Sequence, residues 1–456
     1  MKAMSFRYMK RISLCLLLAV FFGSPVTAQV DTLSVPSEYM QMSVQELMEE
    51  GNSLFNQQEY RQARAYYAAV VKKDTSQGGA WARLSETEYN TYDLSDAQKF
   101  LAEALEVEPG NQEWRARFQN ISKLVDAMSA GIDAQKGREY ETALQKFDEV
   151  LKTYPDFAPA LYHKGLVYRS MKEPDSSATY LRKAIDADPT AKRYRQAYEN
   201  LAKMHFQDGI EAFRRGNLSG AEQEFRTTTR IDSSFKQAHY MLGVISRRRG
   251  NVQNAIDYYQ EALNADPEYE KAWYALGIAY KSIARDNQAL EAFTEAADIN
   301  PNYTKAHNER GLILTKQENY QAAAQAFQRA IQTNSQYAPA YEGLGIVYQK
   351  QEKFQQAANQ FLTAIEFDQD NESLYYRLSE VYGKLGQWQQ TKQYANEALE
   401  RQPNWAAALI SLGDAECHMG NVEAAKSAWN KAKSDAQWRP VAEHRIEILD
   451  KTGECE

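Results

Sequence analysis

Histidine and cysteine are the side chains that most often bind transition metals or act as acid, base or nucleophile, and this chain of 456 residues holds few of them. The histidines are His163, His205, His239, His307, His418 and His444, and the cysteines are Cys15, Cys417 and Cys455. No two of them have the His-x-x-x-His or Cys-x-x-Cys spacing that is typical of metal sites. The sequence therefore predicts no metal site and no cofactor.

Other signatures of catalysis are also missing from the sequence. It has no Gly-rich phosphate loop and no Gly-x-Ser-x-Gly elbow. Acidic pairs such as Glu49-Glu50 are expected on a solvent-facing helix surface. The net charge is −8, and it becomes −12 without residues 1–28, which carry four basic and no acidic residues. A chain with this negative charge would be repelled by the phosphate groups of nucleic acids. We expect neither an enzyme nor a nucleic-acid-binding protein.

The N-terminus has the three parts of a secretory signal. A basic segment, Met1–Arg11, precedes the apolar run Ile12–Gly23, and small residues at Val26 and Ala28 precede Gln29. The 12 apolar residues are too few for a bilayer, which needs about 20. This pattern predicts cleavage between Ala28 and Gln29 and a periplasmic or secreted protein. The alternative is a buried N-terminal helix.

The elements that would position any functional residue come from an internal repeat of 34 residues. Its eleven copies begin at Val44, Gly78, Leu124, Ala158, Ala202, Lys236, Glu270, Thr304, Ala338, Glu372 and Ala406. Position 8 is Gly in nine copies, position 20 is Ala in nine, position 27 is Ala in eight and position 32 is Pro in six. Position 24 is usually aromatic, as at Phe147, Phe225, Tyr259, Phe293, Phe327, Phe361 and Trp429.

This period predicts two antiparallel helices in each copy. Apolar residues at positions 4, 7, 8 and 11 share one helical face, and those at 20, 24 and 27 share another. Small residues are needed where two helix backbones cross closely, and proline near position 32 ends the second helix. A single pair cannot bury its own apolar face, so successive pairs must stack into a solenoid.

These positions resemble the tetratricopeptide repeat family over 374 residues. The resemblance implies an all-α, right-handed superhelical solenoid of helix pairs, with a concave groove that binds peptides or proteins. It implies no enzyme and names no partner.

The segments outside the repeats complete the expected organisation. The boundaries are 1–28 for the signal peptide, 29–43 for a flexible lead-in, 44–111 for two repeats, 112–123 for a helical insert, 124–191 for two repeats, 192–201 for a second helical insert, 202–439 for seven repeats and 440–456 for a capping helix and tail. Each insert should lengthen the helix that follows it, either changing the superhelix pitch or forming a protruding contact surface. Val441, Ile448 and Leu449 should cover the last repeat. Cys417 and Cys455 lie near this cap, either as a disulfide, which export would permit, or as two free thiols.

In this family the first helix of each pair lines the groove, chiefly through positions 2, 5, 9, 12 and 13. Position 5 is often aromatic, position 9 is apolar in seven successive repeats, and positions 12 and 13 gather Arg and Lys. The candidate partner-binding residues are Tyr162, Leu166, Arg169, Arg214, Tyr240, Val244, Arg247, Arg248, Tyr274, Ile278, Lys281, Leu312, Lys316, Ile346 and Lys350. They suit an extended or helical protein segment with apolar and acidic residues. Alternatively, position 9 packs against the next pair and the cations favour helix C-termini.

Two functions remain from the sequence. The first is a non-catalytic protein-interaction scaffold of the cell envelope. The second is a regulatory or targeting subunit of an envelope enzyme, or of a secretion or polysaccharide assembly complex.

Overall fold

A computed structural model describes residue 30 and residues 33–455 of the chain. Within these residues the regular structure is entirely helical, with 23 α-helices and one short 3-10 helix. The predicted signal peptide, 1–28, and its cleavage site after Ala28 lie outside the described residues.

The chain divides into two compact units, residues 1–204 and 205–456. The first contains η1 (Ser37–Gln41), α3 (Val44–Asn56), α4 (Tyr60–Lys73), α5 (Gly78–Asn90), α6 (Leu94–Val107), α7 (Gln112–Lys136), α8 (Tyr140–Thr153), α9 (Ala158–Ser170) and α10 (Pro174–Ala187). The division between the units falls inside α11 (Lys192–Arg214).

The second unit continues the same alternation of helices. It contains α12 (Leu218–Ile231), α13 (Lys236–Arg248), α14 (Val252–Ala265), α15 (Glu270–Ser282), α16 (Asp286–Ile299), α17 (Thr304–Lys316), α18 (Tyr320–Thr333), α19 (Ala338–Lys350), α20 (Phe354–Phe367), α21 (Glu372–Lys384), α22 (Trp388–Arg401), α23 (Ala406–His418), α24 (Val422–Ala432) and α25 (Arg439–Thr452). The odd-numbered helices up to α23 are the first helices of the repeats, and the even-numbered ones are the second helices.

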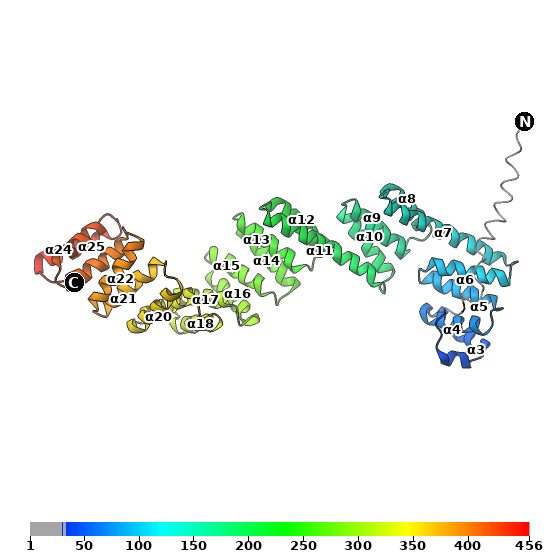
Figure 1. Cartoon of the computed structure of the whole chain (residues 1–456), viewed down its shortest axis with the longest axis horizontal. Coiled ribbons are helices and arrows are strands. Elements are labelled where there is room, and N and C mark those ends of the chain that lie inside the picture. Colours follow the sequence, from blue (N-terminus) through cyan, green and yellow to red (C-terminus); the bar gives the residue numbers. More distant parts are fainter. Residues whose placement is uncertain (1–29, 31–32, 456) are drawn as a thin grey trace, which may run out of the picture. The chain divides into compact units, whose positions relative to one another are not determined.

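Within each unit the helix pairs stack in chain order (Figure 1). Helices α13 and α14 pack together as one pair, α14 packs on α15 of the next pair, and the same order continues to α24. The predicted all-α solenoid of antiparallel helix pairs is confirmed. Nine of the eleven repeats begin at the first residue of a helix, as α13 does at Lys236 and α15 at Glu270.

The turn inside each pair depends on one left-handed residue at position 15. All eleven repeats have positive φ there, for example 82° at Gly250 and 56° at Ala284. Seven of these residues are not glycine, although a side chain in this region is sterically disfavoured. The backbone therefore adopts the same tight turn between the two helices even where the residue at position 15 is not glycine.

The glycine at position 8 allows the two helices of a pair to approach closely. A Cβ added to Gly277 would lie 2.6 Å from Cε1 of Phe293, the buried aromatic residue at position 24 of the same repeat. The two repeats with serine at position 8 have smaller residues at position 24, with Leu101 opposite Ser85 and Ala395 opposite Ser379. Positions 8 and 24 thus share one limited space.

Both inserts form the beginnings of long helices, α7 and α11. Ile121 of α7 is buried in the core of the first two repeats, and Trp114 packs against that core. Tyr194 of α11 is buried beside Leu161 and Ala184. These contacts pack both inserts against other helices of the first unit.

The expectation of a flexible lead-in does not fit its described residues. Leu33 is buried in the core of the first repeats, and Tyr39 of η1 stacks on Tyr66 of α4 with ring centroids 4.2 Å apart. The sequence offered no period by which this contact could be predicted, because the segment precedes the first repeat.

At the other end, α25 packs on α24 and closes the last repeat. Leu449 is buried there as expected, but Val441 is 37% exposed, and Ala442 and Ile446 make the contact instead. The expectation for Val441 was wrong because the register of α25 turns that residue outward. A disulfide joins Cys417 of α23 to Cys455, with Cα atoms 5.8 Å apart, so the two cysteines are paired.

Candidate protein-binding surface

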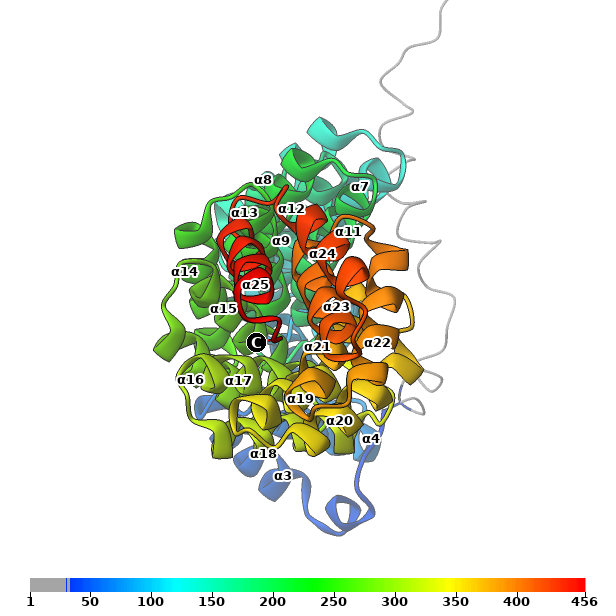
Figure 2. The ribbon, with the colours of Figure 1, turned by 90° about the vertical axis from the view of Figure 1, so that its left-hand side faces the viewer.

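First helices form the inner side of the second unit. In Figure 2, α15, α17, α19 and α21 lie toward the inside of the curve, and α14, α16, α18, α20 and α22 lie around the outside. First helices of successive repeats also contact one another, as α13 contacts α15 and α17 contacts α19. We call the surface made by α13, α15, α17 and α19 the inner face.

Tyrosine rings pack against one another on the first two helices of this face. Tyr240 at position 5 of α13 lies 5.5 Å from Tyr269, and Tyr274 at position 5 of α15 lies 5.0 Å from Tyr303, measured between ring centroids. Burial, followed by the nearby Glu309, Tyr303 and Tyr337, raises the pKa of Tyr274 to about 12. The hydroxyl groups therefore remain protonated at neutral pH and can donate hydrogen bonds.

The aromatic partners at position 34 were not predicted from the sequence. Aromatic residues occupy that position in six of the eleven repeats, namely Phe157, Phe235, Tyr269, Tyr303, Tyr337 and Trp405. Each is the N-cap of the next first helix, for example Tyr269 before α15. Their recurrence every 34 residues is the signal that could have found them.

The apolar residues at position 9 are neither fully buried nor fully free. Val244 and Ile278 are partly buried against one core cluster and Ile346 against another, while Leu312 is 37% exposed. Each of these side chains combines packing with accessible apolar area. The packing that the sequence offered as an alternative is present at this position, and a role in partner binding stays a prediction.

The basic residues are less free than the sequence suggested. Lys281 Nζ lies 2.5 Å from Glu309 Oε2, and Lys316 Nζ lies 2.5 Å from Asp286 Oδ2. These acids come from neighbouring helices, so only the tertiary structure reveals that the two lysines are partly neutralised. Arg248 has its guanidinium carbon 5.8 Å from the ring centroid of Phe213.

Other predicted cations keep their charge available. Within the described part of the chain, Arg169, Arg214, Arg247 and Lys350 form no ion pair, and all four are exposed. The cationic part of the inner face is therefore concentrated at Arg247, Arg248 and Lys350.

Three predicted residues belong to the first unit instead. Tyr162, Leu166 and Arg169 lie on α9. Tyr162 contacts Tyr194, with ring centroids 5.0 Å apart, and the guanidinium carbon of Arg193 lies 5.7 Å from its ring. They form a separate set that does not join the residues of α13–α19 in one compact unit.

The residue at position 4 anchors its helix to the preceding segment in six repeats. Trp273 Nε1 donates to the carbonyl oxygen of Pro267 at 2.8 Å, and His307 Nε2 donates to that of Pro301 at 3.0 Å. His239 makes the same bond. His205 occupies the same position but lacks this bond, and its ring contacts Glu224 instead.

Comparison with known families gives matches along most of the chain. Family models described as tetratricopeptide repeat match residues 48–114, 128–192, 206–270 and 274–339, and further models of that description match 314–380 and 372–404. These segments cover more than half of the sequence. The chain belongs to the tetratricopeptide repeat family. Tetratricopeptide repeats are protein-interaction modules, and this chain is accordingly a protein-interaction scaffold that binds other proteins or peptides.

Several solved tetratricopeptide repeat structures resemble parts of the chain. The crystal structure of MamA is 28% identical over 36% of this chain and 95% of its own, with a TM-score of 0.35. A tetratricopeptide repeat protein from Parabacteroides merdae is 19% identical over 55% of this chain and 99% of its own, with a TM-score of 0.40. PilF from Pseudomonas aeruginosa is 20% identical over 47% and 98%, with a TM-score of 0.41. These likenesses are too low to bear on the partner.

No curated protein matches the chain. In the part that the structure describes, every helix is too short or too polar to cross a membrane.

Proposed function

We propose that this tetratricopeptide repeat protein is an exported, non-catalytic scaffold of the cell envelope whose inner face binds a protein segment with apolar and acidic residues. The observation that carries the proposal is the juxtaposition on α13 and α15 of packed tyrosines, partly buried Val244 and Ile278, and exposed Arg247. Aromatic anchors flanked by arginine are the usual composition of a strong binding patch.

Two further observations support export. The N-terminal 28 residues have the pattern of a cleaved signal peptide, although they lie outside the described residues. The disulfide between Cys417 and Cys455 suits an oxidising compartment, because the cytosol keeps most thiols reduced.

Binding should depend on the inner face but not on the outer helices. We would select peptides from a displayed library on the purified chain and measure the affinity of a selected peptide for Tyr274→Ala and Ile278→Ala. An interface anchor contributes about 2 kcal/mol or more, which corresponds to a loss of roughly thirtyfold in affinity. Melting temperatures are measured on the same samples, because a purely structural role would lower stability and leave binding unchanged. That outcome would contradict the proposal.

Charge is tested separately by reversing Arg247 and Arg248 to Glu together. The association rate and its salt dependence should both fall for an acidic peptide. The matched control reverses Arg329 of α18 and Lys431 of α24, two exposed cations on second helices, with the same change in net charge. If both pairs slow association equally, net charge rather than the inner face attracts the peptide.

A further inference from the structure

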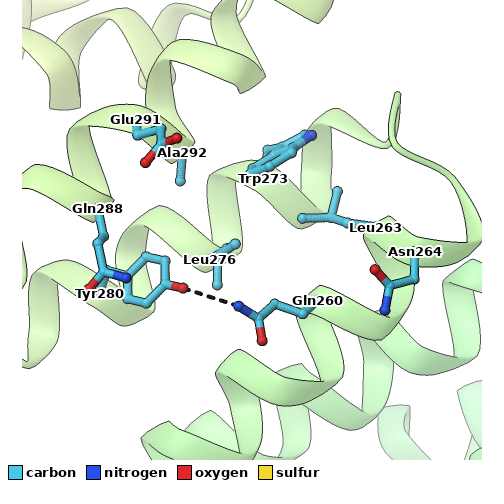
Figure 3. A pocket seen from close by; sticks show the side chains of 9 residues that line it. All are labelled: Gln260, Leu263, Asn264, Trp273, Leu276, Tyr280, Gln288, Glu291 and Ala292. Carbon is cyan, nitrogen blue, oxygen red and sulfur yellow. Dashed lines mark hydrogen bonds between the residues drawn. The ribbon is translucent and has the colours of Figure 1, made fainter.

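The repeat Ala202–Phe235 differs from the later repeat Glu270–Tyr303 at three positions that lie close together in space. In the repeat Glu270–Tyr303, positions 4, 7 and 23 are Trp273, Leu276 and Ala292. These side chains line a hollow of about 300 Å³ between helices, which Figure 3 shows with the indole ring along one side. The hollow has an apolar lining at these three positions.

The same three positions in the repeat Ala202–Phe235 are His205, Asp208 and Glu224. Asp208 and Glu224 line a hollow of about 350 Å³ there. Nitrogen and oxygen donors thus stand where the later repeat has apolar side chains. All three residues belong to the second unit.

His205 lacks the hydrogen-bond acceptor that the residue at position 4 has in other repeats. In six other repeats the side chain at position 4 donates to the carbonyl oxygen six residues earlier. For His205 that carbonyl belongs to Glu199, which lies inside the continuous helix α11, where carbonyl groups accept from the helix itself. The His205 ring instead places Nδ1 2.6 Å from Glu224 Oε2.

The three side chains converge as metal ligands do. One ligand atom from each of His205, Asp208 and Glu224 lies within 4.8 Å of the other two. His205 and Asp208 are three residues apart and share a face of α11, and Glu224 comes from α12. The side chain of His205 is 14% exposed and that of Glu224 is 32% exposed, whereas Asp208 is exposed. A bound ion would therefore be shielded from water on the side of His205 and Glu224.

We propose that His205, Asp208 and Glu224 bind a divalent transition-metal ion. One imidazole nitrogen and two carboxylate oxygens are suitable ligands for Zn²⁺, which takes such donors at about 2.0–2.2 Å. Tetrahedral coordination separates the donors by about 3.4 Å, a spacing that small side-chain rotations would achieve from the present arrangement. In such a site a water molecule takes the fourth position, and Asp208 and Glu224 line the hollow that would hold it. Arg215 also lines that hollow, but its guanidinium pairs with Glu211 at 2.5 Å, which offsets its charge.

The proposal is tested by titrating the purified chain with ZnCl₂ in a calorimeter and by recording the visible absorption of bound Co²⁺. The ligand variants are His205→Ala, Asp208→Asn and Glu224→Gln. The last two keep the shape of side chains that are at least partly exposed, so they should fold normally, as circular dichroism would check. We expect one Zn²⁺ per chain, a loss of at least tenfold in affinity for each variant, and loss of the tetrahedral Co²⁺ absorption in His205→Ala.

The control variant is His239→Ala. It removes a histidine from the same position of the next repeat, where the ring is bonded to the carbonyl group of Ser233. This variant should bind Zn²⁺ as the unaltered chain does. Absence of stoichiometric binding, or binding that survives unchanged in Asp208→Asn and Glu224→Gln, would overturn the proposal. Equal loss in His239→Ala would overturn it as well, because the affinity would then depend on the number of histidines.

Discussion

Replacing Gly277 with alanine should destabilise the repeat that contains it, although alanine is the better helix former. The added Cβ would lie 2.6, 2.7 and 2.9 Å from three ring carbons of Phe293, which is fully buried and cannot move away. Overpacking of this kind costs about 1–3 kcal/mol, and the helical preference for alanine returns up to about 1 kcal/mol. The net loss in free energy of unfolding should therefore reach about 2 kcal/mol.

The matched control is Gly79→Ala in α5. A Cβ at Gly79 meets no atom within 4 Å, so this change should stabilise the protein by up to about 1 kcal/mol. Guanidinium unfolding followed by circular dichroism gives the direction of each change. Amide hydrogen exchange of α15 and α16 shows whether the loss is confined to the altered repeat, as nearest-neighbour stacking requires.

A second substitution tests the cause directly. In the repeat Gly78–Asn111, Ser85 stands opposite Leu101, which shows that a Cβ at position 8 is compatible with leucine at position 24. Gly277→Ala should therefore cost at least about 1 kcal/mol less in a Phe293→Leu background. An equal cost in both backgrounds, or stabilisation by Gly277→Ala alone, would refute the reasoning that the aromatic ring excludes a side chain at Gly277.

Two other predictions concern the turns and the first unit. Ala284→Gly should raise the free energy of unfolding by about 1 kcal/mol, because Ala284 has a φ of 56°. Ala324→Gly inside α18 should lower it by a similar amount. Denaturant unfolding measures both changes, and a change in the same direction for both variants would contradict the prediction. Burial, helped by Arg193 and Lys136, lowers the pKa of His163 from 6.5 to about 4. The stability that neutral His163 contributes is present above pH 6.5 and is lost as the pH falls toward 4. His163→Gln should flatten this decline in melting temperature, and an unchanged decline would exclude His163 as its source.

The repeat architecture could be predicted from the sequence because it depends on contacts that recur at fixed spacings along the chain. The 34-residue period locates the helix pairs. Glycine at position 8 and an aromatic residue at position 24, such as Gly277 and Phe293, indicate where the two helices of a pair cross closely. Membership in the tetratricopeptide repeat family follows from the same positions. Each of these features depends mainly on residues within one repeat or its direct neighbour.

Contacts between residues without such a period were decided only by the tertiary structure. Lys281 is a candidate partner-binding residue in the sequence, and only the structure shows that it pairs with Glu309 of the next repeat. The sequence also left open whether Cys417 and Cys455 form a disulfide, because a separation of 38 residues does not show whether the chain after α25 comes back to α23. The division of the chain into two compact units after residue 204 could not be predicted either, because the repeat pattern continues across that residue.

His205 shows the physical reason for this difference. In the sequence it occupies the same position as His239 and His307, and a pattern can assign it only their packing role. Its surroundings differ because the insert 192–201 extends α11 backward and removes the free carbonyl group that the other two rings bind. Residue type and spacing determine which helices form, whereas the partner of a polar side chain depends on which atoms the folded helices bring within reach.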